Sequence, residues 1–153
     1  MILAKIAVLI VTGYLLLSSC WLLLLSLASW FYRPKLERNA FPLRLLVIIP
    51  AHNEEQQIAA TIHSTRKCDY PQELVDIAVI ADNCTDGTAK AAANCEAWVH
   101  VRSDTRLRGK GAALDWFLRK NREQLEDYGG IVFIDADSCP DRNMLRALSQ
   151  SLA

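Results

Sequence analysis

Two carboxylates, those of Asp135 and Asp137, directly follow an apolar run of four residues and are separated by one alanine. Side chains two positions apart in an extended chain point the same way, so both carboxylates should face one region. Two ionised carboxylates that close repel each other unless a cation lies beside them. Oxygen ligands of this kind suit Mg²⁺ or Mn²⁺, which bind one or two carboxylates together with substrate phosphates. Asp135 and Asp137 are therefore candidate metal ligands, and ordinary turn residues are the alternative.

Two other polar stretches could bind the parts of a nucleotide. The first, from Asp82 to Thr88, is a turn that opens a helix, and Asp82 could accept hydrogen bonds from a nucleobase or a ribose. Turn formation and helix capping are the alternative role of these residues. The second, Arg106 to Gly111, brings cations and amides to a helix N-terminus, which suits phosphate, unless it is only a solvated basic loop. It is not a P-loop, because glycine follows Lys110 where Ser or Thr is required.

The elements that would position these residues alternate between strand and helix after residue 42. Hydrophobic patterning predicts strands at residues 43–49, 75–81, 97–101 and 131–134, and helices at about 53–66, 88–94, 110–125 and 141–152. Asn53, which precedes two glutamates, is the predicted cap of the first helix. Strands separated by helices build right-handed crossovers and a parallel sheet covered on both faces. Ligands bind beyond the carboxyl ends of such strands, where all of the candidate residues fall.

The first 32 residues differ in composition from the rest of the chain. From Ile6 to Tyr32 there are 27 consecutive uncharged residues, whereas about 20 helical residues cross a bilayer core. We expect residues 1–32 to be a transmembrane anchor; a cleaved signal peptide, with its apolar core of roughly 7 to 15 residues, is the alternative. We expect a single span in the cell membrane, and because basic residues are more frequent after the span than before it, the part that follows the span should be cytoplasmic. Residues 33–42, with two prolines, read as a linker.

Charge and cysteine content exclude several kinds of partner and site. After residue 32 the net charge is −1, from 16 basic and 17 acidic residues, so no nucleic-acid partner is expected. The five cysteines are odd in number and include no C-x-x-C pair, which indicates neither a disulfide framework nor a zinc site. Reduced thiols are the expectation for a cytoplasmic domain.

Four motifs taken together are more specific than any one of them. They are VIIPAHNEE, VIADNCTDGTA, RGKGAAL and IVFIDADS, in this order and at the predicted strand ends. They closely resemble the nucleotide-sugar-binding half of the family 2 glycosyltransferases, and the resemblance covers residues 43–153. It implies an α/β fold in which a parallel sheet with covering helices forms a partial GT-A, Rossmann-like unit. The apolar first segment resembles the amino-terminal anchor of membrane-bound members, so one transmembrane helix should precede that unit.

The resemblance also implies roles for individual residues of the donor site. Pro50, Ala51 and Glu54 match the opening loop that cradles the nucleotide, and Asp82 matches the acidic residue that contacts the base. Lys110 falls in the basic, glycine-containing loop near the donor.

The D-x-D motif of the family corresponds to Asp135 and Asp137. In the family this pair positions the donor and the divalent metal, Mg²⁺ or Mn²⁺, that bridges its diphosphate. The implied reaction is an inverting, metal-dependent transfer of a sugar from a nucleotide-diphosphate sugar, most simply a UDP-sugar, to a polysaccharide or lipid-linked acceptor.

The chain departs from the family pattern after this motif. Family members continue into an acceptor-binding half with an acidic general base, and many membrane synthases carry a Q-x-x-R-W element; neither is present here. We therefore expect a donor-binding half, either a fragment or a truncated product, with the general base beyond Ala153. One alternative is an inactive, membrane-tethered nucleotide binder. Another is a phosphatase of the haloacid-dehalogenase type, with Asp135 as nucleophile, although that signature normally opens its domain.

Overall fold

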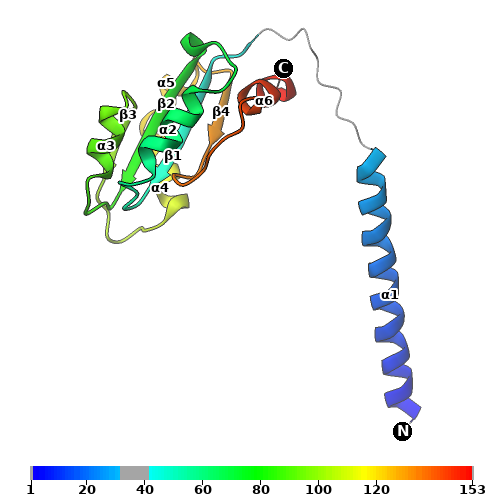
Figure 1. Cartoon of the computed structure of the whole chain (residues 1–153). Coiled ribbons are helices and arrows are strands. Elements are labelled where there is room, and N and C mark those ends of the chain that lie inside the picture. The colour runs from blue at the N-terminus through cyan, green and yellow to red at the C-terminus, as the bar shows by residue number, and fades with distance from the viewer. Residues whose placement is uncertain (1, 32–41, 153) are drawn as a thin grey trace. The chain divides into compact units, whose positions relative to one another are not determined.

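The computed structural model describes residues 2–31 and 42–152, which belong to two separate units, residues 1–35 and 36–153 (Figure 1). The first unit is the helix α1, Ile2–Phe31. Its stretch Ala4–Phe31 is long and apolar enough to cross a membrane, and a signal sequence would share these properties. Three hydroxyl side chains of α1 donate to carbonyls of the preceding turn, so they need no water as partner (Thr12, Ser18 and Ser29). The predicted linker lies, except for its last residue, outside the described residues.

The second unit contains a four-stranded parallel sheet. Its strands are β1 (Leu45–Ala51), β2 (Val75–Asp82), β3 (Trp98–Arg102) and β4 (Gly130–Phe133), in the order β3-β2-β1-β4. All three strand pairs are parallel, which confirms the predicted α/β class. The chain moves outward from β1 to β3 and then returns to the other side of β1. This reversal creates a switch point, where sheets of this kind leave a crevice at their carboxyl edge.

Helices cover both faces of the sheet because the strands are apolar on both faces (Figure 1). The helices are α2 (Ile58–Arg66), α3 (Thr88–Asn94), α4 (Lys110–Lys120), α5 (Arg122–Leu125) and α6 (Met144–Leu152), with the 3₁₀ turn η1 (Gln72–Leu74). On one face Val47 and Ile49 pack in a core with Ile62 of α2. On the other face, Ile48 shares a core with Phe117 of α4.

The predicted helix start at Asn53 is wrong, since α2 begins at Ile58. Asn53 has a left-handed backbone with φ 56°, and the residues between it and α2 form turns. Tertiary hydrogen bonds replace the expected capping: the amide of Glu54 donates to the hydroxyl of Thr88, and the amide of Glu55 donates to the carboxylate of Asp86. The loop after β1 is thus held by the loop after β2.

Two other helices also differ from their predicted bounds. The helix predicted at residues 110–125 is divided at Asn121, whose buried side-chain amide donates to the carbonyl of Phe117 and so competes with the helical pattern. The last helix begins at Met144 rather than at Asp141. Asp141 instead accepts hydrogen bonds from Asn143 in the turn before that helix.

Candidate functional site

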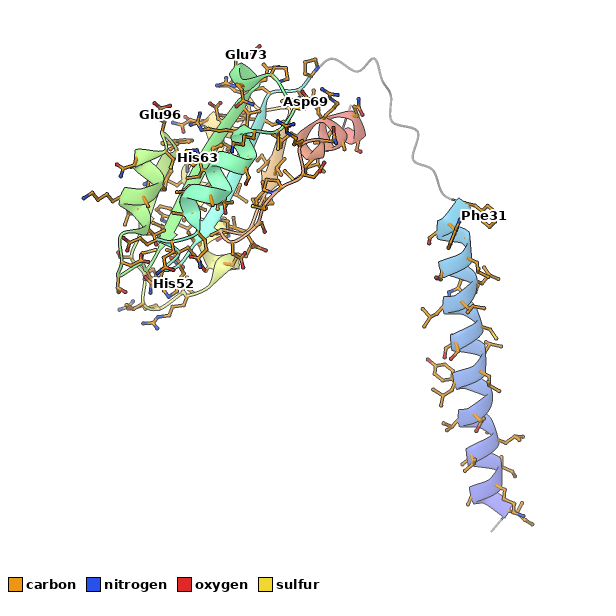
Figure 2. All side chains as sticks on the ribbon, in the orientation of Figure 1. Phe31, His52, His63, Asp69, Glu73 and Glu96 are labelled. Carbon is orange, nitrogen blue, oxygen red and sulfur yellow. The ribbon has the colours of Figure 1, made fainter. Side chains whose placement is uncertain are left out.

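A cleft of about 470 Å³ lies at the carboxyl ends of β1 and β2. Figure 2 labels His52 at this end of the sheet, whereas Glu73 and Asp69 lie at the opposite end. Three chain segments line the cleft, namely the ends of β1 and β2 with their following loops and the start of α4 (Pro50, Ala51, His52, Asn53, Asp82, Asn83, Thr85, Arg108, Gly109, Lys110 and Ala113). Of the residues predicted for the site, the structure brings Pro50, Ala51, Asp82 and Lys110 into this lining.

The first wall of the cleft is the loop that follows β1. The side-chain oxygen of Asn53 accepts a hydrogen bond of 2.8 Å from the amide of Thr85, which fixes the loop against the one after β2. His52 contacts the carbonyl of Asp82 through Nδ1 at 2.7 Å. Glu54 is not among the lining residues, and its backbone amide is what ties this loop to Thr88. The opening loop is therefore rigidly placed, with Pro50 and Ala51 as its contribution to the wall.

Asp82 provides a nearly buried carboxylate in the second wall, with its side chain 9% exposed. Its Oδ1 accepts hydrogen bonds from Nη1 of Arg102 at 2.6 Å and from the side-chain amide of Asn83 at 3.0 Å. Its Oδ2 accepts none from the described residues. Asn83 has a left-handed backbone, with φ 51°, a conformation that asparagine tolerates better than most residues. One oxygen of Asp82 is thus held, and the other is free to accept a donor.

The third wall is the basic loop before α4. Asp104 accepts hydrogen bonds from the amides of Leu107 and Arg106, and these bonds, with the nearby charge of Arg102, hold the pKa of Asp104 below its ordinary value. Gly109 has φ 101°, which L side chains rarely adopt, so a glycine is required where the loop turns into the helix. Lys110 is the first residue of α4, where the backbone amides point outward.

The D-x-D pair follows β4 and adjoins this loop through Lys110. Asp135 and Asp137 are exposed while Ile134 and Ala136 are buried, and because β4 ends at Phe133 both aspartates lie in the turn that follows the strand. The ammonium of Lys110 forms an ion pair with the carboxylate of Asp135. Both carboxylates are therefore accessible to solvent, and that of Asp135 is already bound to a cation of the protein.

The donor atoms of this pair fit a divalent cation that shares its coordination with a ligand. Within residues 2–31 and 42–152, no group of three or more His, Cys, Asp or Glu side chains gathers for a metal. Two carboxylates alone leave most of the coordination sphere of Mg²⁺ or Mn²⁺ to water and phosphate oxygens. The site thus has the composition of a metal site that is completed by a substrate.

Sequence reasoning missed three residues that hold the site together. Arg102 and Asn83 hold the carboxylate of Asp82, and Thr61 donates a 2.6 Å hydrogen bond to the carbonyl of Ala136, between the two aspartates. A signal for Arg102 existed, since a cation ends one strand and an acid ends the strand before it. Thr61 gave no signal, because its partner lies 75 positions away.

Known proteins match a large part of this chain. The model of the family described as "Glycosyl transferase family 2" matches residues 46–153. The probable glycosyltransferase YdaM of Bacillus subtilis (strain 168) is 29% identical over 117 residues, which are 71% of this chain and 26% of that protein.

Solved structures agree with this family match. The mannosyltransferase PcManGT from Pyrobaculum calidifontis, in complex with GDP-Man and Mn²⁺, has a TM-score of 0.66 at 26% identity, over 82% of this chain and 37% of that one. Glucosyl-3-phosphoglycerate synthase from Mycobacterium tuberculosis, in complex with Mn²⁺, UDP and glucosyl-3-phosphoglycerate, has a TM-score of 0.53 at 28% identity, over 75% and 43% of the two chains.

The extent of these matches determines what they establish. The family match covers well over half of the chain, including all four strands and the four motifs. The chain spans 26% of the length of YdaM and 37% of the length of PcManGT, so the matches concern one part of those proteins. The resemblance inferred from the motifs is confirmed: the chain belongs to glycosyltransferase family 2.

Proposed function

We propose that residues 43–153 bind the donor of a glycosyltransferase that moves a sugar from a nucleotide-diphosphate sugar to an acceptor. The observation that carries this proposal is the cleft at the carboxyl ends of β1 and β2, which Asp82 and Lys110 line and which Lys110 joins to Asp135, in the segment after β4, through an ion pair. The carboxylate of Asp82 suits a base, and the cations of Arg108 and Lys110 suit a diphosphate. The carboxylates of Asp135 and Asp137 suit a metal.

The residues have separate tasks in this proposal. The free Oδ2 of Asp82 accepts a hydrogen bond from the base, which lies beside the wall to which Pro50 and Ala51 contribute. Arg108 and Lys110 attract the phosphates at the N-terminus of α4.

Asp135 and Asp137 hold the divalent cation, Mg²⁺ or Mn²⁺, and Asp135 also positions the donor. When bound, the cation offsets the negative charge that develops on the diphosphate as the sugar leaves. Glu54 acts through its backbone, by fixing the opening loop to Thr88. The likeness to structures that contain Mn²⁺ supports the metal.

We further propose UDP as the nucleotide, inversion at the transferred sugar, and a polysaccharide or a lipid-linked sugar as the acceptor. One similar structure holds UDP and another holds GDP-Man, so the base is the finer part of the proposal. The length and composition of α1 support residues 1–32 as a membrane anchor, with residues 33–42 as a linker and the donor-binding part in the cytoplasm. Family membership favours neither the phosphatase nor the inactive nucleotide binder.

Calorimetric titration of the full chain in detergent, with Mn²⁺ present, tests the nucleotide. We expect UDP to bind more tightly than GDP and ADP, and Asp82→Asn to weaken UDP binding roughly tenfold, the value of a hydrogen bond to a charged group. Asp76→Asn is the matched control, because Asp76 lies on the same strand at the opposite end and contacts Arg44 and Tyr128. ADP binding as tight as UDP binding, or an equal loss in both variants, would contradict the proposal.

A further inference from the structure

We propose that Arg102, which does not line the cleft, is a positioning residue that locks the Asp82 carboxylate and the basic loop of residues 103–109 into one geometry. The base and the phosphates of a nucleotide would then be recognised as one unit. The inference rests on the proposed nucleotide-binding function and adds a residue outside the four motifs to it.

The guanidinium of Arg102 bridges two parts of the cleft. Arg102 ends β3 in register with Asp82 of β2, and its side chain is only 4% exposed. Nη1 donates to Oδ1 of Asp82 at 2.6 Å. Nη2 donates to the carbonyl of Leu107 at 2.6 Å and to the carboxylate of Asp104 at 3.0 Å. Nη1 therefore donates to the wall that contains Asp82, and Nη2 donates to the basic loop before α4.

Asn83 closes a second connection between the same two parts. The backbone amide of Asn83 donates to the carbonyl of Arg102 at 2.7 Å, and its side-chain oxygen accepts a hydrogen bond from the backbone amide of Asp104 at 2.8 Å. Its side-chain NH₂ donates to the same oxygen of Asp82 that Arg102 contacts. A left-handed backbone such as that of Asn83 persists where the surrounding contacts over-determine it. These four residues form one closed network between the carboxyl ends of β2 and β3.

The network decides which oxygen of Asp82 remains available. Arg102 and Asn83 both occupy Oδ1, so Oδ2 is left without a partner among the residues that the structure describes. Neutralising a buried carboxylate requires only one nearby cation. The bond from Nη2 to the carbonyl of Leu107 has no part in that neutralisation, and it instead places the loop that carries Arg108 and leads into Lys110. Lysine has a single nitrogen and lacks the planar fork, so it could keep the charge while losing the bridge.

Amide hydrogen exchange of the full chain in detergent, without nucleotide, tests the lock itself. We expect residues 103–109 to exchange roughly tenfold faster in Arg102→Lys, because the two bonds from Nη2 are lost. Arg66→Lys is the matched control, since Arg66 also donates to two carbonyls, those of Cys95 and Glu96. Exchange of this loop at the wild-type rate in Arg102→Lys would overturn the proposal.

A second variant covers the case in which Arg102→Lys fails to fold. Asp104 is partly exposed and does not line the cleft, and Asp104→Ala removes its bonds to Arg102, Arg106 and Leu107 while leaving the pair of Arg102 with Asp82. We expect faster exchange in residues 103–109 of Asp104→Ala as well. A loop that stays as protected as in the wild type would show that the network does not hold it.

Nucleotide selectivity distinguishes positioning from charge neutralisation. With Mn²⁺ present, the ratio of the ADP and UDP dissociation constants should fall roughly tenfold in Arg102→Lys and stay unchanged in Arg66→Lys. A wild-type ratio in Arg102→Lys would mean that the residue only neutralises Asp82, and would overturn the inference. If the wild type itself does not prefer UDP to ADP, the proposed preference for UDP fails, and the exchange experiment alone decides whether the lock exists.

Discussion

Lys110 occupies one of the two carboxylates that the proposed metal requires. Its ammonium pairs with Asp135, and both side chains are about half exposed. An exposed pair of this kind is weak and exchanges readily with water and ions. In the proposed site, Lys110 would therefore occupy Asp135 until a metal and a diphosphate bind, and would then have phosphate oxygens as its alternative partners.

Removing this competing cation should strengthen metal binding in the absence of nucleotide. We expect Lys110→Gln to bind Mn²⁺ about twofold to fivefold more tightly than the wild type, as measured by electron paramagnetic resonance of free Mn²⁺. The same variant should bind UDP more weakly, because a phosphate partner is lost. Lys90→Gln is the control, an exposed lysine on α3. Unchanged Mn²⁺ affinity in Lys110→Gln would show that Lys110 and the metal do not compete.

Residue types at strand ends were predictable from the sequence, whereas the contacts between them were not. Pro50 and Asp82, at the ends of β1 and β2, line the cleft as expected, because the carboxyl ends of parallel strands meet at one edge. Lys110, expected near the donor from the family resemblance, lines the cleft from the start of α4. The bond of Arg102 to Asp82 depends on the register of β2 and β3, which a single sequence does not specify. Glu54 was assigned to the opening loop that cradles the nucleotide, and its amide makes the contact that fixes this loop to Thr88.

Among the elements, α2 supports the turn that carries both aspartates. Thr61 of α2 is buried, and its hydroxyl donates at 2.6 Å to the carbonyl of Ala136, between Asp135 and Asp137. The turn has only one other described backbone bond, from the amide of Ser138 to the carbonyl of Asp135. The position of the carboxylate pair therefore depends on the packing of α2 against the sheet.

Replacing Thr61 by valine keeps the shape of the side chain and removes this bond. We expect Thr61→Val to lower the free energy of unfolding by about 1–3 kcal/mol, because the carbonyl of Ala136 stays buried without a donor. It should also weaken Mn²⁺-dependent UDP binding. Thr65→Val is the matched control on the same helix, since Thr65 is equally buried and bonds only to the carbonyl of Thr61. Equal effects on UDP binding in both variants would exclude a role for the Ala136 bond.

Element type was predicted well and element boundaries less so. The four strands and the order of helices follow from periodicity, which depends on burial on both faces of the sheet. The start of α2 was wrong because Asn53 bonds to Thr85 across the cleft and adopts a left-handed backbone instead of capping a helix. The break at Asn121 comes from one buried side-chain bond, which no periodicity reveals.

The length and composition of α1 predict that the whole chain is recovered in the membrane fraction of a cell lysate. A helix with 28 residues of span length and no charge after Lys5 should remain in the membrane through alkaline carbonate washes. Placing a lysine at Leu16, near the middle of the helix, should release much of the chain, because a charge at the bilayer centre costs about 2.5–3.5 kcal/mol. Wild-type protein in the soluble fraction would contradict the anchor.

The stability of the second unit should depend on His100 in mild acid. Burial, and secondarily the charge of Lys120, lowers the pKa of His100, whose ring packs against Trp98 and Phe117. Since the unfolded chain takes up the proton first, stability holds above about pH 6.5 and falls as the pH drops from there through the lowered pKa of the folded state. His100→Phe should flatten this loss in the melting temperature, and His63→Gln, at an exposed histidine, should leave it unchanged. The same slope in all three proteins would contradict the assignment.

The proposed donor site depends most on a divalent cation held by Asp135 and Asp137 together with a nucleoside diphosphate. Calorimetric titration of UDP into the full chain in detergent, with Mn²⁺ or with EDTA, tests this directly. We predict that Mn²⁺ tightens UDP binding at least about tenfold, that Asp137→Ala abolishes the gain, and that Asp141→Ala, in the turn before α6, keeps it. UDP binding of equal strength with Mn²⁺ and with EDTA, or a full gain in Asp137→Ala, would contradict the account.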